Sequence, residues 1–315
     1  MRTCPAVVVL VGPTAAGKTA LLDAVFGSRA SREAYGLPEA EVVSADSMQA
    51  YRGMDIGTGK PDAALRARLP HSLIDIRDIE EQYTVGDFAR LADEACVEIS
   101  DRGRLPIVSG GTAYYVRNFI CGLPGTPAAD RGIREGVARD LAARGAASLR
   151  AELAEADPVS AARIHENDLY RLTRALEIIR LTGRPMAEFA PPSGPRAGRR
   201  FLTMGIAPPP RVLAARIGFR VDGMIAAGLA EEVAGLRAAG HRAEEPGMRA
   251  IGYREFFADG RLDEIAERIK LDSRSYAKRQ MTFFRKLPGI EWIGADPEEF
   301  AARVSVIVHA AFSGL

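Results

Sequence analysis

Short apolar runs alternate with amphipathic segments through the first third of the chain. The runs at 7–11, 41–45 and 105–109 predict buried strands, and the spacing of apolar residues at 18–26 and 88–100 predicts helices. Strands that alternate with helices in this way predict a parallel sheet covered by helices. In such folds ligands bind beyond the carboxyl ends of the strands.

The pattern changes near residue 122. Turn-forming clusters at Gly122–Pro127 and Pro191–Pro195 enclose a segment rich in Ala, Arg and Glu, which is predicted to be helical as far as about Phe189. Another strand is expected at 201–207, followed by helices from about Val212 to Arg285. We therefore expect an α/β fold in which a helical insertion domain, 124–197, interrupts a core made of 1–123 and 198–315.

Composition narrows the class of protein. The 315 residues are 47% apolar and 26% charged, and they contain neither a secretory signal pattern nor the roughly 18 consecutive apolar residues of a membrane-spanning helix. Three cysteines without CxxC spacing (Cys4, Cys96 and Cys121) and four scattered histidines argue against a disulfide framework or a zinc site. We expect a cytoplasmic protein that does not associate with membranes.

The formal net charge is only +1, which does not indicate a globally basic nucleic-acid binder. Charge is nevertheless uneven, because the segment Arg274–Lys286 is basic and carries interleaved aromatic residues. A second arginine series is expected on one helix. A nearly neutral protein can still present one basic face to a polyanion. The arginines of the second series are Arg163, Arg171, Arg174, Arg180 and Arg184.

The first predicted strand leads into a glycine-rich loop. Residues 12–19, GPTAAGKT, match the P-loop pattern G-x-x-x-x-G-K-[ST] with a strand before and a helix after it. Backbone amides, the helix N-terminus and the Lys18 ammonium favour phosphate, and the Thr19 hydroxyl can reach Mg²⁺. A kinase, an ATPase and a transferase are all compatible with this motif, whereas the alternative is a chance glycine-rich turn. The predicted diphosphate-binding residues are Gly12, Pro13, Thr14, Ala15, Ala16, Gly17, Lys18 and Thr19.

Polar residues follow the next two strands. Asp46 could hold Mg²⁺ in a kinase, act as a general base on an amine or hydroxyl, or simply cap a helix. Further along, Thr58 and Lys60 are either phosphate contacts or solvated turn residues. The sequence Gly110–Thr112 lets backbone approach a ligand and supplies a hydroxyl, although an ordinary strand-to-helix turn uses the same residues.

In this order and spacing the segments resemble the tRNA dimethylallyltransferase (isopentenylpyrophosphate transferase) family. The resemblance covers nearly the whole chain, and the absence of the zinc-finger extension of the eukaryotic members predicts the bacterial form. The segments that carry it are Gly12–Thr19, Ser44–Pro61, Leu73–Ile76, Gly110–Thr112, Ile164–Glu177, Arg216–Arg220, Gly228–Val233, Ala250–Glu255 and Lys278–Gln280.

The resemblance implies a reaction. The Gly12–Thr19 loop would hold the diphosphate of dimethylallyl diphosphate rather than ATP, with Mg²⁺ as cofactor. The dimethylallyl group would pass to N6 of the adenosine at position 37 of tRNA, flipped out of the anticodon loop. By position, Asp46 is the expected base, Thr112 lies near the reacting centre, and Arg220 joins Lys18 in a clamp on the departing diphosphate.

The resemblance also implies that a monomer contacts the anticodon stem-loop of tRNA. From charge alone, the arginines near 167–182 could equally form a solvated helix face with ion-pair partners such as Arg174 and Glu177. Phe283 and Phe284 could stack on bases or belong to the core. The implied tRNA contacts are Asp46, Ser47, Met48, Gln49, Thr112, Arg134, Tyr170, Arg171, Leu172, Thr173, Arg174, Met248, Arg249, Ala250, Ile251, Gly252, Tyr253, Lys278, Arg279, Gln280, Met281, Thr282, Phe283, Phe284 and Arg285.

Some positions depart from the family pattern, and other functions fit parts of it. Ser72 stands where a second histidine is common, and Ala113 replaces the usual glycine, which leaves the donor preference open. The alternatives are an adenylate isopentenyltransferase of the cytokinin type, a P-loop small-molecule kinase, and a non-catalytic RNA-binding module. The helical insertion favours tRNA over a free nucleotide, and intact Lys18, Thr19 and Asp46 favour an enzyme.

Overall fold

The chain folds into two compact units. The structure, a computed structural model, describes residues 6–128 and 130–312, so that Cys4 lies outside the described residues. The larger unit comprises Met1–Ile120 and Gly194–Leu315, and the smaller unit is Cys121–Ser193. The segment predicted as an insertion, 124–197, corresponds to the smaller unit with its boundaries shifted toward the N-terminus by three or four residues.

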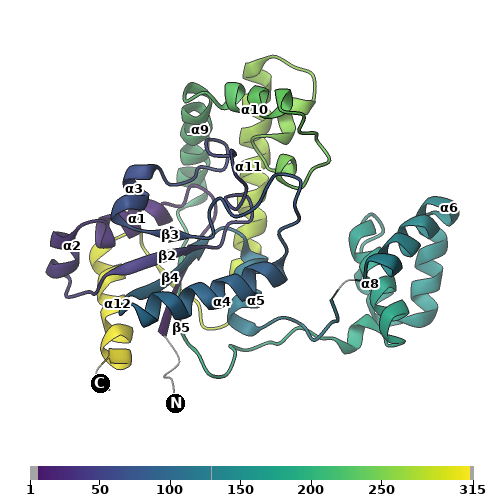
Figure 1. Cartoon of the computed structure of the whole chain (residues 1–315), viewed down its shortest axis with the longest axis horizontal. Coiled ribbons are helices and arrows are strands. Elements are labelled where there is room, and N and C mark those ends of the chain that lie inside the picture. Colours follow the sequence, from purple (N-terminus) through teal and green to yellow (C-terminus); the bar gives the residue numbers. More distant parts are fainter. Residues whose placement is uncertain (1–5, 129, 313–315) are drawn as a thin grey trace. The chain divides into compact units, whose positions relative to one another are not determined.

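A parallel sheet organises the larger unit (Figure 1). The described residues form six strands in the order β3-β2-β4-β1-β5-β6, and Val8 of the central strand pairs with Ile107 of β4 and with Leu202 of β5. All six residues of β1 are buried, as expected for a strand covered on both faces. This confirms the predicted α/β fold. The strands are β1 (Ala6–Val11), β2 (Ala40–Ser44), β3 (His71–Ser72), β4 (Leu105–Gly110), β5 (Arg200–Ile206) and β6 (Glu291–Ile293).

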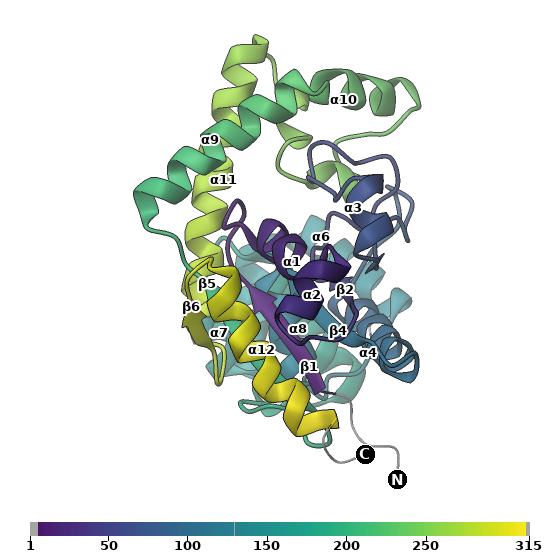
Figure 2. The same cartoon turned by 90° about the vertical axis from the view of Figure 1, so that its left-hand side faces the viewer.

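Helices cover both faces of this sheet. Helices α1 and α12 lie together on one face, which Figure 2 shows from the front, and Phe26 and Phe300 meet edge to face there with ring centroids 6.4 Å apart. Helices α4 and α5 cover the other face, where the rings of Phe88 and Tyr115 stack at 4.8 Å. The covering helices are α1 (Lys18–Phe26), α2 (Arg29–Ala34), α3 (Ala63–Arg68), α4 (Val85–Asp101), α5 (Ala113–Cys121) and α12 (Pro297–Phe312).

Three further helices lie beyond the carboxyl ends of the strands (Figures 1 and 2). They are α9 (Pro210–Ala226), α10 (Leu229–Ala238) and α11 (Leu262–Phe284), with the short helical turns Gly247–Arg249 and Arg254–Phe257 between the last two. The region predicted to be helical from Val212 to Arg285 is thus three helices with loops between them. No helix in the described part of the chain has both the length and the apolar composition needed to cross a membrane.

The smaller unit is helical, with α6 (Arg131–Ala156), α7 (Pro158–Arg163) and α8 (Leu169–Thr182) around a core of its own. The prediction of one helix for the whole arginine series was wrong. Arg163 belongs to α7, and Arg184 follows Gly183, whose φ of 68° ends α8. A left-handed conformation of this kind is typical of the glycine that terminates a helix.

Candidate active site

A cavity of about 440 Å³ lies where the strands of the larger unit end. The Gly12–Thr19 loop, the residues after β2 and β4, and one side each of α9 and α11 contribute to its wall. The wall combines three kinds of surface. Cationic groups come from Lys18 and Arg220, a carboxylate comes from Asp46, and apolar side chains come from Ile217, Val221, Met224 and Ile269.

The Gly12–Thr19 loop connects β1 to α1 in the predicted strand–loop–helix order. The Lys18 ammonium donates hydrogen bonds to the carbonyls of Gly12 and Pro13, at 2.7 and 3.0 Å. Burial lowers the pKa of Lys18 to about 8, with the nearby carboxylate of Asp46 opposing this shift and Arg220 adding to it. Thr19 is exposed at the start of α1. The loop therefore presents a cation whose pKa is lowered to about 8 beside the N-terminus of α1.

Asp46 lies two residues after the end of β2 and lines the cavity. Its Oδ1 accepts the backbone N–H of Met48 at 2.9 Å, which is the hydrogen bond of an Asx turn. The first described helix after this turn is α3, and Asp62 caps that helix. The interpretation of Asp46 as a helix cap is therefore wrong, and one carboxylate oxygen stays available to the cavity.

Thr112 is bonded to the same turn. Its hydroxyl accepts the N–H of Ser47 at 2.9 Å and donates to the Ser47 hydroxyl at 3.2 Å. Gly110 and Gly111 line the cavity, but Thr112 is not among the lining residues. Thr112 therefore contacts Ser47, the residue after Asp46, and does not reach the cavity surface.

Arg220, on α9, faces the loop that runs from 55 to 60. Its Nη2 donates to the carbonyl of Thr58 at 3.4 Å, and a Cβ on Gly59, whose φ is 60°, would lie 2.0 Å from that nitrogen. The same loop is held from α10, because the Glu232 carboxylate accepts the N–H of Ile56 at 2.9 Å and the hydroxyl of Tyr253 at 2.5 Å. This loop is therefore built to lie closely against Arg220.

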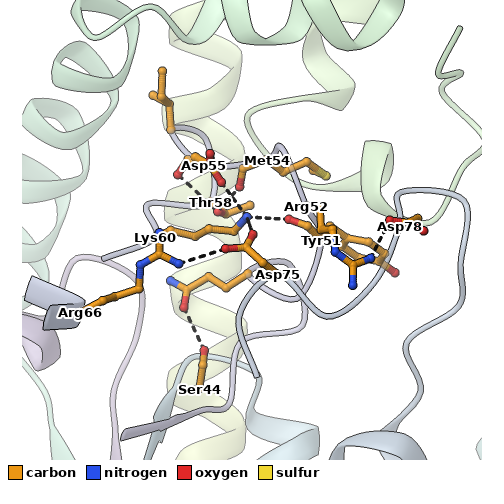
Figure 3. A network of polar contacts seen from close by, with 12 residues as sticks. Ser44, Tyr51, Arg52, Met54, Asp55, Thr58, Lys60, Arg66, Asp75 and Asp78 are labelled. Atoms are coloured by element: carbon orange, nitrogen blue, oxygen red, sulfur yellow. Dashed lines mark hydrogen bonds and ion pairs between the residues drawn. The ribbon is translucent and has the colours of Figure 1, made fainter. Parts of the chain in front are cut away.

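Lys60 is a structural residue of that loop (Figure 3). Its side chain is only 3% exposed, and its ammonium donates to the carbonyl of Tyr51 at 2.6 Å, to Asp55 at 2.7 Å and to Asp75 at 2.5 Å. Burial opposes ionisation of Asp75, yet hydrogen bonds from Lys60 and Arg66 hold the pKa of Asp75 below its usual range. Lys60 is thus neither a phosphate contact nor a solvated turn residue. Thr58 lines the cavity but donates its hydroxyl to the carbonyl of Met54, at 2.6 Å.

The expected tRNA contacts of the larger unit divide into exposed and buried side chains. Those at Arg249, Lys278, Arg279, Thr282 and Arg285 are exposed. Of the aromatic pair, Phe283 is half-buried, with its ring 6.5 Å from that of Tyr114, and Phe284 is fully buried in the core. Met248, Tyr253 and Phe284 are buried and do not line the cavity, which excludes direct contact with RNA by these side chains in this conformation. Ala250 and Gln280 are also buried but line the cavity, so burial does not exclude their contact with a base inside it.

The expected contacts of the smaller unit divide in the same way. Tyr170 is 77% exposed and Arg171 is also exposed, whereas Leu172 is buried. Arg174 is bonded to the buried carboxylate of Glu177 at 3.0 Å, three residues along the same helix. The expected ion pair of Arg174 is therefore present, but its side chains are only 20% and 8% exposed and do not form part of a solvated helix face. Arg134 reaches the same carboxylate at 3.5 Å.

Several residues of the cavity wall were not singled out from the sequence, among them two that can carry a charge. Tyr276 and Arg254 both line it, and burial raises the pKa of the Tyr276 phenol to about 12. The signal for Tyr276 was its position one helical turn before Gln280, in the basic segment with interleaved aromatic residues. Across the described residues, no three or more His, Cys, Asp or Glu side chains are grouped closely enough to hold a metal ion.

Comparison with known proteins places these observations in one family. Residues 49–287 match the IPP transferase family. The chain is 43% identical over 300 residues to the tRNA dimethylallyltransferase of Geobacter sulfurreducens, which covers 91% of each chain. Its structure is similar to that of the tRNA isopentenylpyrophosphate transferase of Bacillus halodurans, with a TM-score of 0.66, 35% identity, and 98% and 97% of the two chains covered. It is also similar to a eukaryotic dimethylallyltransferase solved acting on tRNA, with a TM-score of 0.79, 26% identity, and 97% and 78% covered.

Proposed function

The chain belongs to the IPP transferase family, and from that premise we propose that it transfers a dimethylallyl group from dimethylallyl diphosphate to N6 of the adenosine at position 37 of tRNA. The observation that carries this proposal is the composition of one cavity wall. It combines the cations Lys18 and Arg220, the carboxylate of Asp46, and an apolar surface from α9 and α11. An allylic diphosphate needs the cations and the apolar surface, and an amine acceptor needs the carboxylate.

We place the diphosphate at the Gly12–Thr19 loop. Departure of an allylic carbon leaves negative charge on the diphosphate, so the protein accelerates the step by stabilising that charge. Lys18, Arg220 and the amides at the start of α1 supply donors that are already oriented, an effect worth a few kcal/mol for each well-placed donor. The dimethylallyl group then lies against Ile217, Val221 and Met224, which exclude water from the developing cation.

Magnesium fits this site as a partner of the donor. The described residues offer no carboxylate cluster, and Mg²⁺ in phosphate sites commonly takes only one or two protein oxygens and fills its shell with phosphate and water. We assign Thr19, which is exposed at the start of α1, as the residue whose hydroxyl would hold it. When bound, the ion would neutralise part of the diphosphate charge.

Asp46 acts on the acceptor. As the bond from N6 to the allylic carbon forms and the bond from that carbon to the diphosphate oxygen breaks, N6 becomes acidic and its proton passes to the Asp46 carboxylate. A positioned carboxylate contributes about 100-fold or more to such a step. The adenosine must leave the anticodon loop to reach a cavity of this kind, which costs a few kcal/mol and least in an unpaired loop.

The tRNA would meet exposed basic residues together with the exposed Tyr170 and the half-buried Phe283. Lys278, Arg279 and Arg285 lie on or next to α11 of the larger unit, and Tyr170 and Arg171 lie on α8 of the smaller unit. These cations would contact phosphates, and Tyr170 and Phe283 are suited to stacking on unpaired bases. We place the reaction in the cytoplasm, carried out by a monomer.

One assay tests the proposal against its alternatives. The protein is incubated with radiolabelled dimethylallyl diphosphate and either unmodified tRNA or AMP, and separately with ATP and candidate small molecules. We expect the radiolabel to appear in tRNA and to be released as N6-dimethylallyladenosine when the tRNA is digested to nucleosides. Label in AMP alone would establish an adenylate isopentenyltransferase, and phosphoryl transfer from ATP without prenylation would establish a kinase.

A further inference from the structure

We propose that Gln280 is a positioning residue that fixes the Gly12–Thr19 loop at a set distance from the turn after β4, and so sets the donor against Asp46. The proposal rests on the proposed function, because it concerns the same two substrates. It also replaces the expectation that the Gln280 side chain contacts tRNA, since that side chain is 3% exposed and both of its polar atoms have partners in the protein.

The amide of Gln280 joins two segments that are distant in the sequence. Its Oε1 accepts the backbone N–H of Thr14 at 2.9 Å, and its Nε2 donates to the carbonyl of Gly111 at 2.7 Å. The partners dictate this orientation, because a backbone N–H can only donate and a carbonyl can only accept. One consequence is that the Thr14 N–H is not available to the diphosphate, although the loop motif alone assigned it there.

Gly111 is a glycine because of this amide. A Cβ built at Gly111 would lie 2.5 Å from Gln280 Nε2 and 4.0 Å from Asp46 Oδ2. A methyl group so close to a hydrogen-bonded amide would force the Gln280 side chain to move. Gly111 has a conformation that other residues can adopt, since it is not among the residues with positive φ, so the close approach is what requires glycine here.

The side-chain amide of Gln280 lies close to the proposed catalytic residues. Asp46 Oδ2 lies 4.0 Å from the position that a Cβ on Gly111 would occupy, so the carboxylate is a near neighbour of the Gly111 backbone. Tyr276 lies one turn before Gln280 on α11, and its phenol is close enough to the side chains of Thr112 and Gln280 for them to oppose the rise in its pKa. The donor loop, the turn after β4 and the neighbourhood of the base therefore converge on a single buried side chain. A displacement of about 1 Å between reacting groups can cost on the order of 100-fold in rate.

A double-mutant cycle with Gln280→Leu and Gly111→Ala tests the proposal. The transfer rate in a single turnover, the affinity for diphosphate and the affinity for tRNA are measured for both single variants and for the double variant. Each single variant is expected to lower the transfer rate about 10- to 100-fold and to weaken diphosphate binding, with tRNA affinity within about twofold of the wild type. The double variant should be no slower than the worse single variant, because both changes break the same contact.

Two further variants test whether lost stability or lost packing explains the rate losses. Val304→Ala, in the fully buried core on α12, serves as a matched control for lost stability and should keep the wild-type transfer rate. Gln280→Glu keeps the acceptor for Thr14 N–H but adds a negative charge near Asp46, which should move the acidic limb of the rate profile to higher pH, a shift that loss of packing would not cause.

Several outcomes would overturn the proposal. Rate losses of the two single variants that multiply in the double variant would show that they act separately. A loss confined to tRNA affinity would return Gln280 to the RNA-contacting residues. If the wild-type protein does not prenylate tRNA at all, the proposed function fails; if the wild type prenylates tRNA and the cycle is additive, only the role of Gln280 fails.

Discussion

The hydroxyl of Thr112 holds the N–H of Ser47 at 2.9 Å, and Ser47 is the residue that follows Asp46. The bond fixes the turn that carries the proposed base, although Thr112 does not line the cavity. We therefore expect Thr112→Val to lower kcat by about tenfold and to change the KM for the donor less than twofold. Thr112→Ser keeps the hydroxyl and is the matched control. A rise in donor KM equal to the fall in kcat would place Thr112 at the donor instead.

Replacement of Asp46 by Asn removes the base and keeps the turn. The amide oxygen of Asn can still accept the Met48 N–H that Asp46 Oδ1 accepts at 2.9 Å, so the fold should persist. We expect kcat to fall about 100-fold or more with little change in donor affinity, because the carboxylate acts on the acceptor. The measurement is a steady-state comparison supported by direct diphosphate binding. An equal loss of donor affinity would contradict the assignment of Asp46 as base.

Donor binding should depend on pH through Lys18. Its pKa is lowered to about 8 in the free protein, and a bound diphosphate anion stabilises the protonated form, so binding requires proton uptake above that pH. The KM for the donor should therefore rise about tenfold between pH 7 and pH 9, with tRNA held at saturation. Lys18→Arg stays charged throughout this range and should show no such rise, even if its donor affinity is lower. A parallel rise in the arginine variant would exclude Lys18 as the titrating group.

Lys60→Met should destabilise the folded protein. The buried ammonium donates to the carbonyl of Tyr51 and to the carboxylates of Asp55 and Asp75 (Figure 3). Its removal takes this partner from all three groups and leaves Asp75 paired with Arg66 alone. We expect a loss of about 2–3 kcal/mol in the free energy of unfolding at pH 7, reduced from a fully buried pair because both carboxylates keep contact with water. Urea unfolding measures it.

Two measurements check whether the loss of stability in Lys60→Met comes from its buried ion pairs. One is the pH dependence of that loss, and the other is the stability of a variant that lacks an exposed ion pair. The pKa of Asp75 is depressed in the folded state, so the stabilisation is present above the unfolded pKa of roughly 4 and is lost as the pH falls through the folded value. The difference between wild type and Lys60→Met should thus shrink below about pH 4. Arg52→Ala removes an ion pair to Asp78 in which both side chains are more than half exposed, and it should cost less than about 1 kcal/mol. Equal losses in the two variants would mean that the burial of Lys60 is unimportant.

Local patterns in the sequence were sufficient for the sheet and the Gly12–Thr19 loop. The strands predicted at 7–11, 41–45, 105–109 and 201–207 end within one residue of β1, β2, β4 and β5, because buried parallel strands are continuous apolar runs bounded by turn residues. The strands β3 and β6 were missed, since two and three residues are too few to establish a pattern.

Contacts between distant segments were beyond the reach of local patterns. Gln280 meets Thr14 across 266 positions, and Glu232 meets Ile56 across 176. The periodicity of the sequence does not reveal that the Gln280 side chain, in a basic segment, points into the protein. It also does not reveal that Lys60 is buried and donates to the carboxylate of Asp75, fifteen residues away. The family resemblance located these segments, but it did not distinguish side chains that hold the loops from side chains that reach a substrate.

The exposed cation of Lys278 offers the clearest test of tRNA binding through α11. Lys278 is exposed and does not line the cavity, so Lys278→Ala should leave kcat and donor KM unchanged and raise the KM for tRNA. Neutralising one phosphate contact should reduce the slope of log affinity against log salt by about 0.7 to 0.9, so that the defect is large at low salt and fades as salt rises. Arg29→Ala is the matched control, because Arg29 is an exposed cation on α2 that contributes nothing to the cavity wall. A defect that is equal at every salt concentration, or one shared by the Arg29 variant, would mean that Lys278 does not contact a phosphate of the tRNA.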